Sequence, residues 1–342
     1  MTPDIEASVT GLLTGNHRIL AKTITLIESS LPDHQAASQA ILERLLPHTG
    51  GAVRLGITGV PGVGKSCFIE ALGLMLLDKG LKTAILAIDP SSTRSGGSIL
   101  ADKTRMGRLA ADTRAFIRPS PSGGTLGGVA RKTRETMLVC EAAGFDVIIV
   151  ETVGIGQSEM TVASMVDFFL VLILAGAGDE LQGIKKGFLE LADALAVTKA
   201  DGDNITRAGI AQRDYQTALH LLRPASPNWS PPVLMCSAKE RSGIEEIWSI
   251  VLKHREVMTA SGERDANRRR QALAWMWSLL EEGLRDRFDR HPEVRNQLPR
   301  LAREVEEGRL PPTAAACQLL SYLDRKTKPA IKKPDESNKL PS

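Results

Sequence analysis

The stretch Gly59-Val60-Pro61-Gly62-Val63-Gly64-Lys65-Ser66 decides the fold of this chain. It matches the pattern GxxxxGK(S/T) at every fixed position, after an apolar run at 53–58 and before an apolar helical pattern at 68–77. Glycines let such a loop wrap closely, so that main-chain N–H groups and the positive end of the next helix face a phosphate. The stretch therefore predicts a strand–loop–helix unit in which Lys65 bridges the β- and γ-phosphates of a nucleotide and Ser66 binds Mg²⁺. Nucleotide contacts are expected along the loop and at Cys67, which follows it.

Further short apolar runs alternate with longer helical patterns between 53 and 258. Besides 53–58, they predict strands at 83–89, 146–152, 168–174, 194–198 and 233–237. Strands that are apolar throughout and separated by helices are typical of a parallel sheet covered on both faces. The sequence therefore predicts an α/β fold, a doubly wound, mainly parallel P-loop NTPase domain with helical extensions at both ends.

Four regions are predicted along the 342 residues. Residues 1–50 are an N-terminal helical extension, with two amphipathic helices at 5–47 separated by a break near 29–32. Residues 51–260 are the nucleotide domain. Residues 261–328 are a C-terminal helical region, and 329–342 are a disordered tail.

The C-terminal region is expected to start with a charged linker at 261–270 and to continue as an amphipathic helix. Its apolar residues recur at spacings of three and four: Leu273, Met276, Leu280, Leu284 and Phe288. Such a stripe has to be buried, either against its own domain or against a second copy of the chain. Because a helical tail after a complete α/β domain is a common dimerisation device, a homodimer is expected.

Composition argues against nucleic-acid and membrane partners. The net charge of +3 comes from 43 basic and 40 acidic residues that are mostly interleaved, and aromatic residues are only 4%. The one basic cluster, at 268–270, is interpreted as a solvated helix face. The longest apolar stretch, at 168–177, is too short to cross a bilayer.

Cysteine usage and the amino terminus favour a cytoplasmic location. The four cysteines are far apart and form no CxxC pair, which fits a reducing compartment. The chain starts with neither a basic leader before an apolar core nor an Arg-rich transit segment.

Two acidic residues at predicted strand ends are candidates for a metal site. Asp89 ends the run at 83–89, and Glu151 lies at the end of the run at 146–152, three residues before Gly154. In the common pattern Asp-x-x-Gly the carboxylate holds Mg²⁺ and the glycine N–H senses the γ-phosphate. Here glutamate replaces aspartate, so direct metal binding, binding through a water and orientation of the attacking water all remain open for Glu151. Lys65, Glu151 and Asp89 are the catalytic candidates.

Base choice is predicted from the segment Thr198-Lys199-Ala200-Asp201, which begins at the end of a predicted strand. The Asp201 carboxylate can accept both N1–H and the exocyclic amine of guanine, two donors that adenine lacks, while the Lys199 stem covers the ring. Thr198 departs from the usual Asn, which leaves one stabilising hydrogen bond in doubt. The loop Ser237-Ala238-Lys239 is expected to back the base, so the nucleotide is GTP or GDP.

With these motifs in this order, the chain resembles the MeaB/ArgK family of G-protein chaperones for methylmalonyl-CoA mutase, whose mitochondrial counterpart is the MMAA protein. The resemblance runs from about residue 10 to about residue 325, and its most specific stretches lie at 59–66, 89–97, 100–106, 120–128, 151–157 and 176–186. Departures are Thr198 for Asn and Ala101 where glycine is frequent.

The resemblance implies a GTPase that gates loading of adenosylcobalamin into a B12-dependent acyl-CoA mutase and helps to remove inactivated cofactor. An adenosyltransferase is a further candidate partner. Asp89, Asp102 and Glu151 are implied as the acids near Mg²⁺, beside Ser66, and 178–187 as the switch that couples nucleotide state to the mutase.

Segments 91–106 and 120–134, rich in Gly, Ser and Arg, are expected to respond to the γ-phosphate. The residue that stimulates hydrolysis stays open, and a partner is one possible source. The candidates within the chain are Arg94, Lys103, Arg105, Arg108 and Lys185.

Three other functions are less compatible with the sequence. A nickel-insertion GTPase would need a His or Cys cluster, which the sequence lacks. A protein kinase or regulator linked to amino-acid uptake would need a catalytic-loop signature, and none is visible. A scaffold that holds GTP without cleaving it is disfavoured by Lys65, Ser66 and Glu151.

Overall fold

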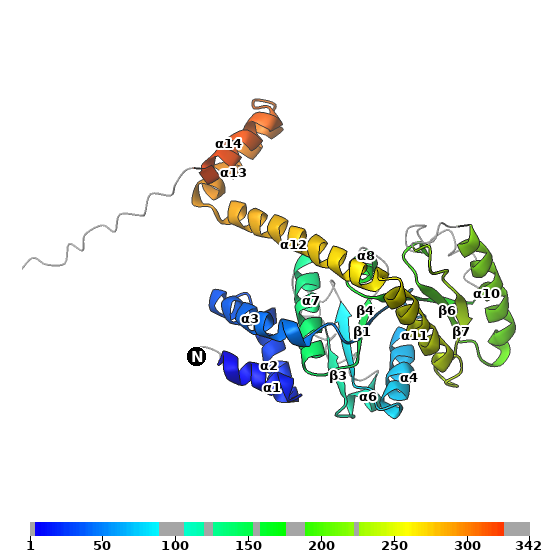
Figure 1. Ribbon diagram of the computed structural model, residues 1–342. Coiled ribbons are helices and arrows are strands. Elements are labelled where there is room, and N and C mark those ends of the chain that lie inside the picture. The colour runs from blue at the N-terminus through cyan, green and yellow to red at the C-terminus, as the bar shows by residue number, and fades with distance from the viewer. Residues whose placement is uncertain are drawn as a thin grey trace, which may run out of the picture. The chain divides into compact units, whose positions relative to one another are not determined.

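The computed structural model of this chain describes residues 4–88, 106–119, 126–152, 158–175, 189–221 and 226–324. Within these ranges seven strands form one parallel sheet in the order β3-β2-β4-β1-β5-β6-β7 (Figure 1). The strands are β1 (Val53–Gly59), β2 (Thr83–Ile88), β3 (Ala115–Arg118), β4 (Val147–Thr152), β5 (Phe168–Leu174), β6 (Ala194–Thr198) and β7 (Val233–Met235). The predicted doubly wound parallel α/β fold is confirmed.

Helices cover both faces of this sheet (Figure 1). One face packs on α7, α8 and α10, with the N-terminal helices in the same core cluster, and the other face packs on α4, α6 and α11. The first set is α1 (Ile5–Leu13), α2 (His17–Glu28), α3 (Pro32–Leu45), α7 (Leu126–Ala142), α8 (Ser158–Ala163) and α10 (Ile205–His220). The second set is α4 (Lys65–Asp78), α6 (Gly107–Ala110) and α11 (Ile244–Ala260). Short 3₁₀ helices are η1 (Leu46–His48) and η3 (Gly202–Asn204).

The N-terminal extension contains three helices, so the prediction of two is wrong. The break near 29–32 exists, but a second break separates α1 from α2 at Thr14–Asn16. There the Asn16 side chain accepts hydrogen bonds from the N–H groups of Arg18 and Ile19 at 3.0 and 3.2 Å, which starts a new helix.

Aspartates tie the amino edge of the sheet together. An aspartate stands directly before each of β4, β5 and β6, and its Oδ2 accepts a main-chain N–H at or next to the start of a neighbouring strand. The pairs are Asp146 with Lys82 at 2.8 Å, Asp167 with Arg54 at 3.2 Å and Asp193 with Phe169 at 2.8 Å. These bonds help to fix which strand follows which at this edge.

The linker predicted at 261–270 is largely helix. α11 ends at Ala260 and α12 (Glu263–Arg290) begins three residues later. The solvated interpretation of Arg268 is also wrong, because its guanidinium pairs with Asp167 and the two side chains are only 15% and 14% exposed. The polar sequence of this segment reflects buried ion pairing as well as solvation.

By packing, the chain divides into two units, Met1–Ala274 and Trp275–Ser342. In the second unit α13 (Pro292–Glu306) and α14 (Pro312–Asp324) share a small core of Val294, Leu301, Ala315, Leu319 and Tyr322, against which Phe288 packs. The other stripe residues of α12, from Leu273 to Leu284, are between 44% and 62% exposed. In the described part of the chain no helix has both the length and the apolar character of a membrane span.

Candidate active site

The loop between β1 and α4 lies at the carboxyl end of the central strand of the sheet. Gly62 and Gly64 have φ angles of +80° and +101°, which residues other than glycine rarely adopt. Val63 is fully buried between them, so its side chain anchors the loop. Pro61 and Cys67 are exposed, and the N–H of Phe68 donates to the Gly64 carbonyl at 2.9 Å as α4 begins.

Lys65 is buried at 8% exposure, and its Nζ donates to the carbonyls of Gly59 at 2.7 Å and Val60 at 3.3 Å. Burial lowers the pKa of Lys65, and the carboxylates of Glu151 and Glu159 oppose that shift. The ammonium group thus lies over the loop, on two carbonyls that phosphate oxygens could replace.

Ser66 and Glu151 come together from α4 and the end of β4. The Ser66 hydroxyl is 3.4 Å from Glu151 Oε1, and Glu151 is 5% exposed. β1 and β4 pair so that Ile57 stands opposite Glu151, which brings the carboxylate to the loop. Hydroxyl and carboxylate oxygens are donors that Mg²⁺ prefers.

Outside the described residues lie four of the candidates for stimulating hydrolysis, Arg94, Lys103, Arg105 and Lys185, and three predicted site residues, Asp89, Asp102 and Gly154. Among the residues that are described, no three His, Cys, Asp or Glu side chains gather as a metal site. The position of these three residues therefore stays a prediction.

Glu159 is a residue that sequence reasoning missed. It lies in the first turn of α8, is 3% exposed and interacts electrostatically with Lys65. The signal was an acidic residue in the first turn of a helix, eight residues after Glu151. Lys65 thus has two buried carboxylates in its surroundings.

Thr198 connects the base-reading segment to the phosphate loop. Its buried hydroxyl lies 2.8 Å from the Val63 carbonyl and 3.2 Å from the Ile173 carbonyl. Thr198, which stands where Asn is usual, therefore has a side-chain hydroxyl in hydrogen-bond contact with the phosphate loop.

The remaining base-reading residues surround the same edge of the sheet. Lys199 has a φ of +55°, and its carbonyl accepts from the Asn204 side chain at 2.8 Å. The hydroxyl of the fully buried Ser237 donates to the carboxylate of Asp201. Ala238 is half-buried and Lys239 exposed. The sheet order places β1, β5 and β6 side by side, so the phosphate and base segments are neighbours.

Comparison with known proteins agrees with this geometry. The family model described as methylmalonyl Co-A mutase-associated GTPase MeaB matches residues 20–293. A protein of Caulobacter vibrioides with GTPase in its name is 55% identical over 318 residues, which are 93% of this chain and 97% of that protein. The mitochondrial methylmalonic aciduria type A homolog of Mus musculus is 45% identical over 326 residues, covering 92% of this chain and 79% of its own.

A crystal structure of an LAO/AO transport system kinase has a TM-score of 0.75 and 40% sequence identity, and covers 94% of this chain and 98% of its own. The family resemblance predicted from the motifs is confirmed. This chain is a GTPase that binds guanine nucleotide, and it belongs to the MeaB family of methylmalonyl-CoA mutase-associated GTPases.

Proposed function

We propose that this GTPase is a metallochaperone-type G protein for a B12-dependent acyl-CoA mutase, either methylmalonyl-CoA mutase or a relative. In this role GTP binding and hydrolysis gate adenosylcobalamin loading and protect or reactivate the mutase. The observation that carries the proposal is the match of residues 20–293 to a family of mutase-associated GTPases. The name of the mouse relative supports the same client. We include an adenosyltransferase as a second proposed partner of the GTPase.

Within this proposal Lys65, Glu151 and Asp89 do the catalytic work, and Ser66, Asp89, Asp102 and Glu151 hold Mg²⁺. The Ser66 and Glu151 oxygens, 3.4 Å apart, fit such an ion. When bound, Mg²⁺ would neutralise charge on the β- and γ-phosphates. Glu151, at the carboxyl end of β4, either contacts the ion or orients the attacking water.

The main chain and Lys65 bind the phosphates. The Lys65 ammonium exchanges the carbonyls of Gly59 and Val60 for β- and γ-phosphate oxygens, so its positive charge stabilises the negative charge of the transition state. Gly154 senses the γ-phosphate through its N–H. Asp201 accepts the two guanine donors, and its contact with Ser237 holds the carboxylate beside the base loop.

We also propose that the chain is a cytoplasmic homodimer. The exposed stripe of α12 supports the dimer, because an apolar face of this kind is otherwise left in water. All four cysteines are free, which supports a reducing compartment.

The client is tested by capture from native cell extract. The immobilised full-length chain is loaded with a non-hydrolysable GTP analogue or with GDP, and retained proteins are identified by mass spectrometry. We expect a B12-dependent acyl-CoA mutase whose recovery changes with the nucleotide, and no such change with the variant Lys65→Ala. Recovery of no such mutase with either nucleotide, from an extract in which the mutase is active, would contradict the proposal.

A further inference from the structure

Residues near the N-terminus of α12 form hydrogen bonds with the turn that joins α8 to β5. This turn consists of residues 164–167. Arg268 of α12 binds the Asp167 carboxylate through Nε at 2.7 Å and Nη2 at 2.6 Å. One helical turn further along α12, Gln271 Nε2 donates to the Val166 carbonyl at 2.9 Å. Arg268 also donates to the carbonyls of Gly50 and Ala52, at 2.7 and 3.0 Å, so it joins this turn to the segment before β1.

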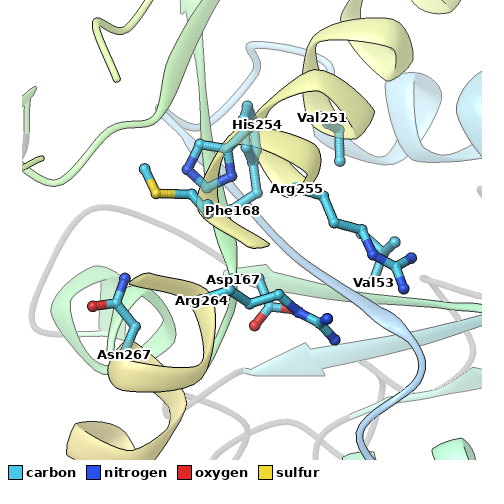
Figure 2. Close-up of a pocket in the computed structure, with 9 residues that line it drawn as sticks. Val53, Asp167, Phe168, Val251, His254, Arg255, Arg264 and Asn267 are labelled. Atoms are coloured by element: carbon cyan, nitrogen blue, oxygen red, sulfur yellow. The ribbon is translucent and has the colours of Figure 1, made fainter. Parts of the chain in front are cut away.

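The Asp167 carboxylate is only 14% exposed, so it needs the charge and hydrogen bonds of Arg268 in place of water. Hydrogen bonds and charge from Arg268, with help from Arg54, outweigh burial and lower the pKa of Asp167. Figure 2 shows Asp167, with Arg264 and Asn267 of α12, among the residues that line a cavity of about 20 Å³.

A third contact reaches the same turn from α7. Arg134 Nη2 donates to the main-chain carbonyl of Ser164 at 2.9 Å and to its hydroxyl at 2.8 Å. Its Nη1 is 3.4 Å from the carbonyl of Gln271. Turn, α7 and α12 are thus linked in one set of hydrogen bonds.

The helix before this turn lies against the nucleotide site. α8 packs on β1 and β4, and a Cβ on Gly56 of β1 would meet Val162 Cγ1 at 2.9 Å and Val166 Cγ2 at 3.0 Å. Glycine at this position lets α8 and its turn approach the strand that leads into the phosphate loop. At the other end of α8, the buried Glu159 interacts electrostatically with Lys65, and its negative charge favours the charged form of the lysine. A displaced turn would therefore move Glu159 relative to Lys65.

We propose that Arg268 and Gln271 are positioning residues for GTP hydrolysis, acting through the turn 164–167 and α8, which packs on the strand before the phosphate loop, to fix the position of Glu159. The first turns of α12 then belong functionally to the active site, although they lie at the opposite edge of the sheet. This inference rests on the assignment of the loop 59–66 as the phosphate site.

The test compares steady-state GTP hydrolysis by Arg268→Gln, Gln271→Leu and Arg255→Gln in the full chain. Arg255 is the matched control, since its Nη2 donates to the Gly51 carbonyl at 3.0 Å and, within the described ranges, no hydrogen bond or ion pair joins its side chain to the turn. We expect Arg268→Gln to lower kcat about tenfold, because small misplacements of catalytic groups cost this much or more. KM for GTP and affinity for GDP should change less than about threefold, and Gln271→Leu should show a smaller loss of kcat. Arg255→Gln should keep the wild-type kcat.

Hydrogen exchange of the amides at 159–167 supplies a readout of the turn itself. Faster exchange there in Arg268→Gln and Gln271→Leu, together with the loss of kcat, supports the proposal. Wild-type kcat in both variants, or an equal loss in Arg255→Gln, overturns it. If Arg268→Gln fails to fold, Gln271→Leu is judged alone: a lower kcat with faster exchange at 159–167 supports the proposal, and a wild-type kcat overturns it. Failure is distinguishable from failure of the phosphate assignment, which would appear as normal hydrolysis by Lys65→Ala.

Discussion

At Lys65 a buried cation is satisfied by the main chain of its own loop. The ammonium lies 2.7 Å from the Gly59 carbonyl, and burial lowers the pKa of the side chain. Lys65→Ala should reduce GTP hydrolysis at least about a hundredfold, the typical loss when a positioned donor to the transition state is removed. Phosphate release measures the rate, and thermal unfolding should show an intact fold. Lys253→Ala, a change at an exposed lysine of α11, is the control. Normal turnover in Lys65→Ala would show that the phosphate assignment is wrong.

Thr198 shows what a sequence pattern leaves undecided. The missing Asn put one hydrogen bond in doubt, but the hydroxyl reaches the Val63 carbonyl at 2.8 Å. Thr198→Val keeps the shape of the side chain and leaves that buried carbonyl without this donor. The cost in folding free energy is about 1–3 kcal/mol. GDP affinity should fall about tenfold if the tie positions the phosphate loop. Thr198→Ser, which keeps the hydroxyl, should bind GDP nearly as wild type does, and equal calorimetric affinities for the Val and Ser variants would remove Thr198 from the site.

Among the elements, those with a strong local pattern were predictable from sequence. β5 and β6 have the predicted bounds because their residues are almost all buried and, apart from the last residue of β6, Thr198, apolar. β3 was missed, since only the first of its four residues is buried and it lies at the sheet edge. The start of α12 was missed because the charges that suggested a linker include Arg268, whose partner Asp167 is 101 residues away. Local polarity does not reveal a distant partner.

At the amino end of β6, Asp193 and the buried His254 of α11 form a pair whose pKa values shift in opposite directions. His254 Nε2 lies 3.6 Å from Asp193 Oδ1, and its ring contacts Phe168 and Trp229 edge to face. Burial raises the pKa of Asp193 to about 7 and lowers the pKa of His254 to about 4. Both shifts favour the neutral form of the side chain.

These shifts predict a pH dependence of stability. The folded chain binds the Asp193 proton more tightly than the unfolded chain, so this group's contribution falls as pH rises from about 4 to about 7. The His254 contribution falls as pH drops from about 6.5 to about 4. Asp193→Asn should remove the first effect, so its free energy of unfolding relative to wild type should rise between pH 4 and pH 7. Urea unfolding at several pH values measures this, and parallel wild-type and variant curves would contradict it.

For the whole molecule, the sequence predicted the parts of the site that follow one another along the chain. The phosphate loop spans eight residues, and its neighbouring strand and helix identify it. Glu159 and the contacts of Arg268 depend on packing between distant segments, so no local pattern contains them. The roles of Asp89, Asp102 and Gly154, and the four predicted regions, stay predictions.

The proposed dimer makes a prediction for the assembled protein. Leu280 lies in the stripe of α12 and is 47% exposed. If this stripe is covered by a second copy, Leu280→Glu would bury two charges without partners, and the dissociation constant should rise at least tenfold, a change of about 1.4 kcal/mol.

Sedimentation velocity over a range of concentrations measures that shift. Ser278→Glu is the matched control, because it adds the same charge at an exposed position outside the stripe. A monomeric wild-type chain would contradict the homodimer. A dimer that withstands Leu280→Glu would place the interface elsewhere, since an unpaired carboxylate is too costly to bury at the centre of an apolar contact.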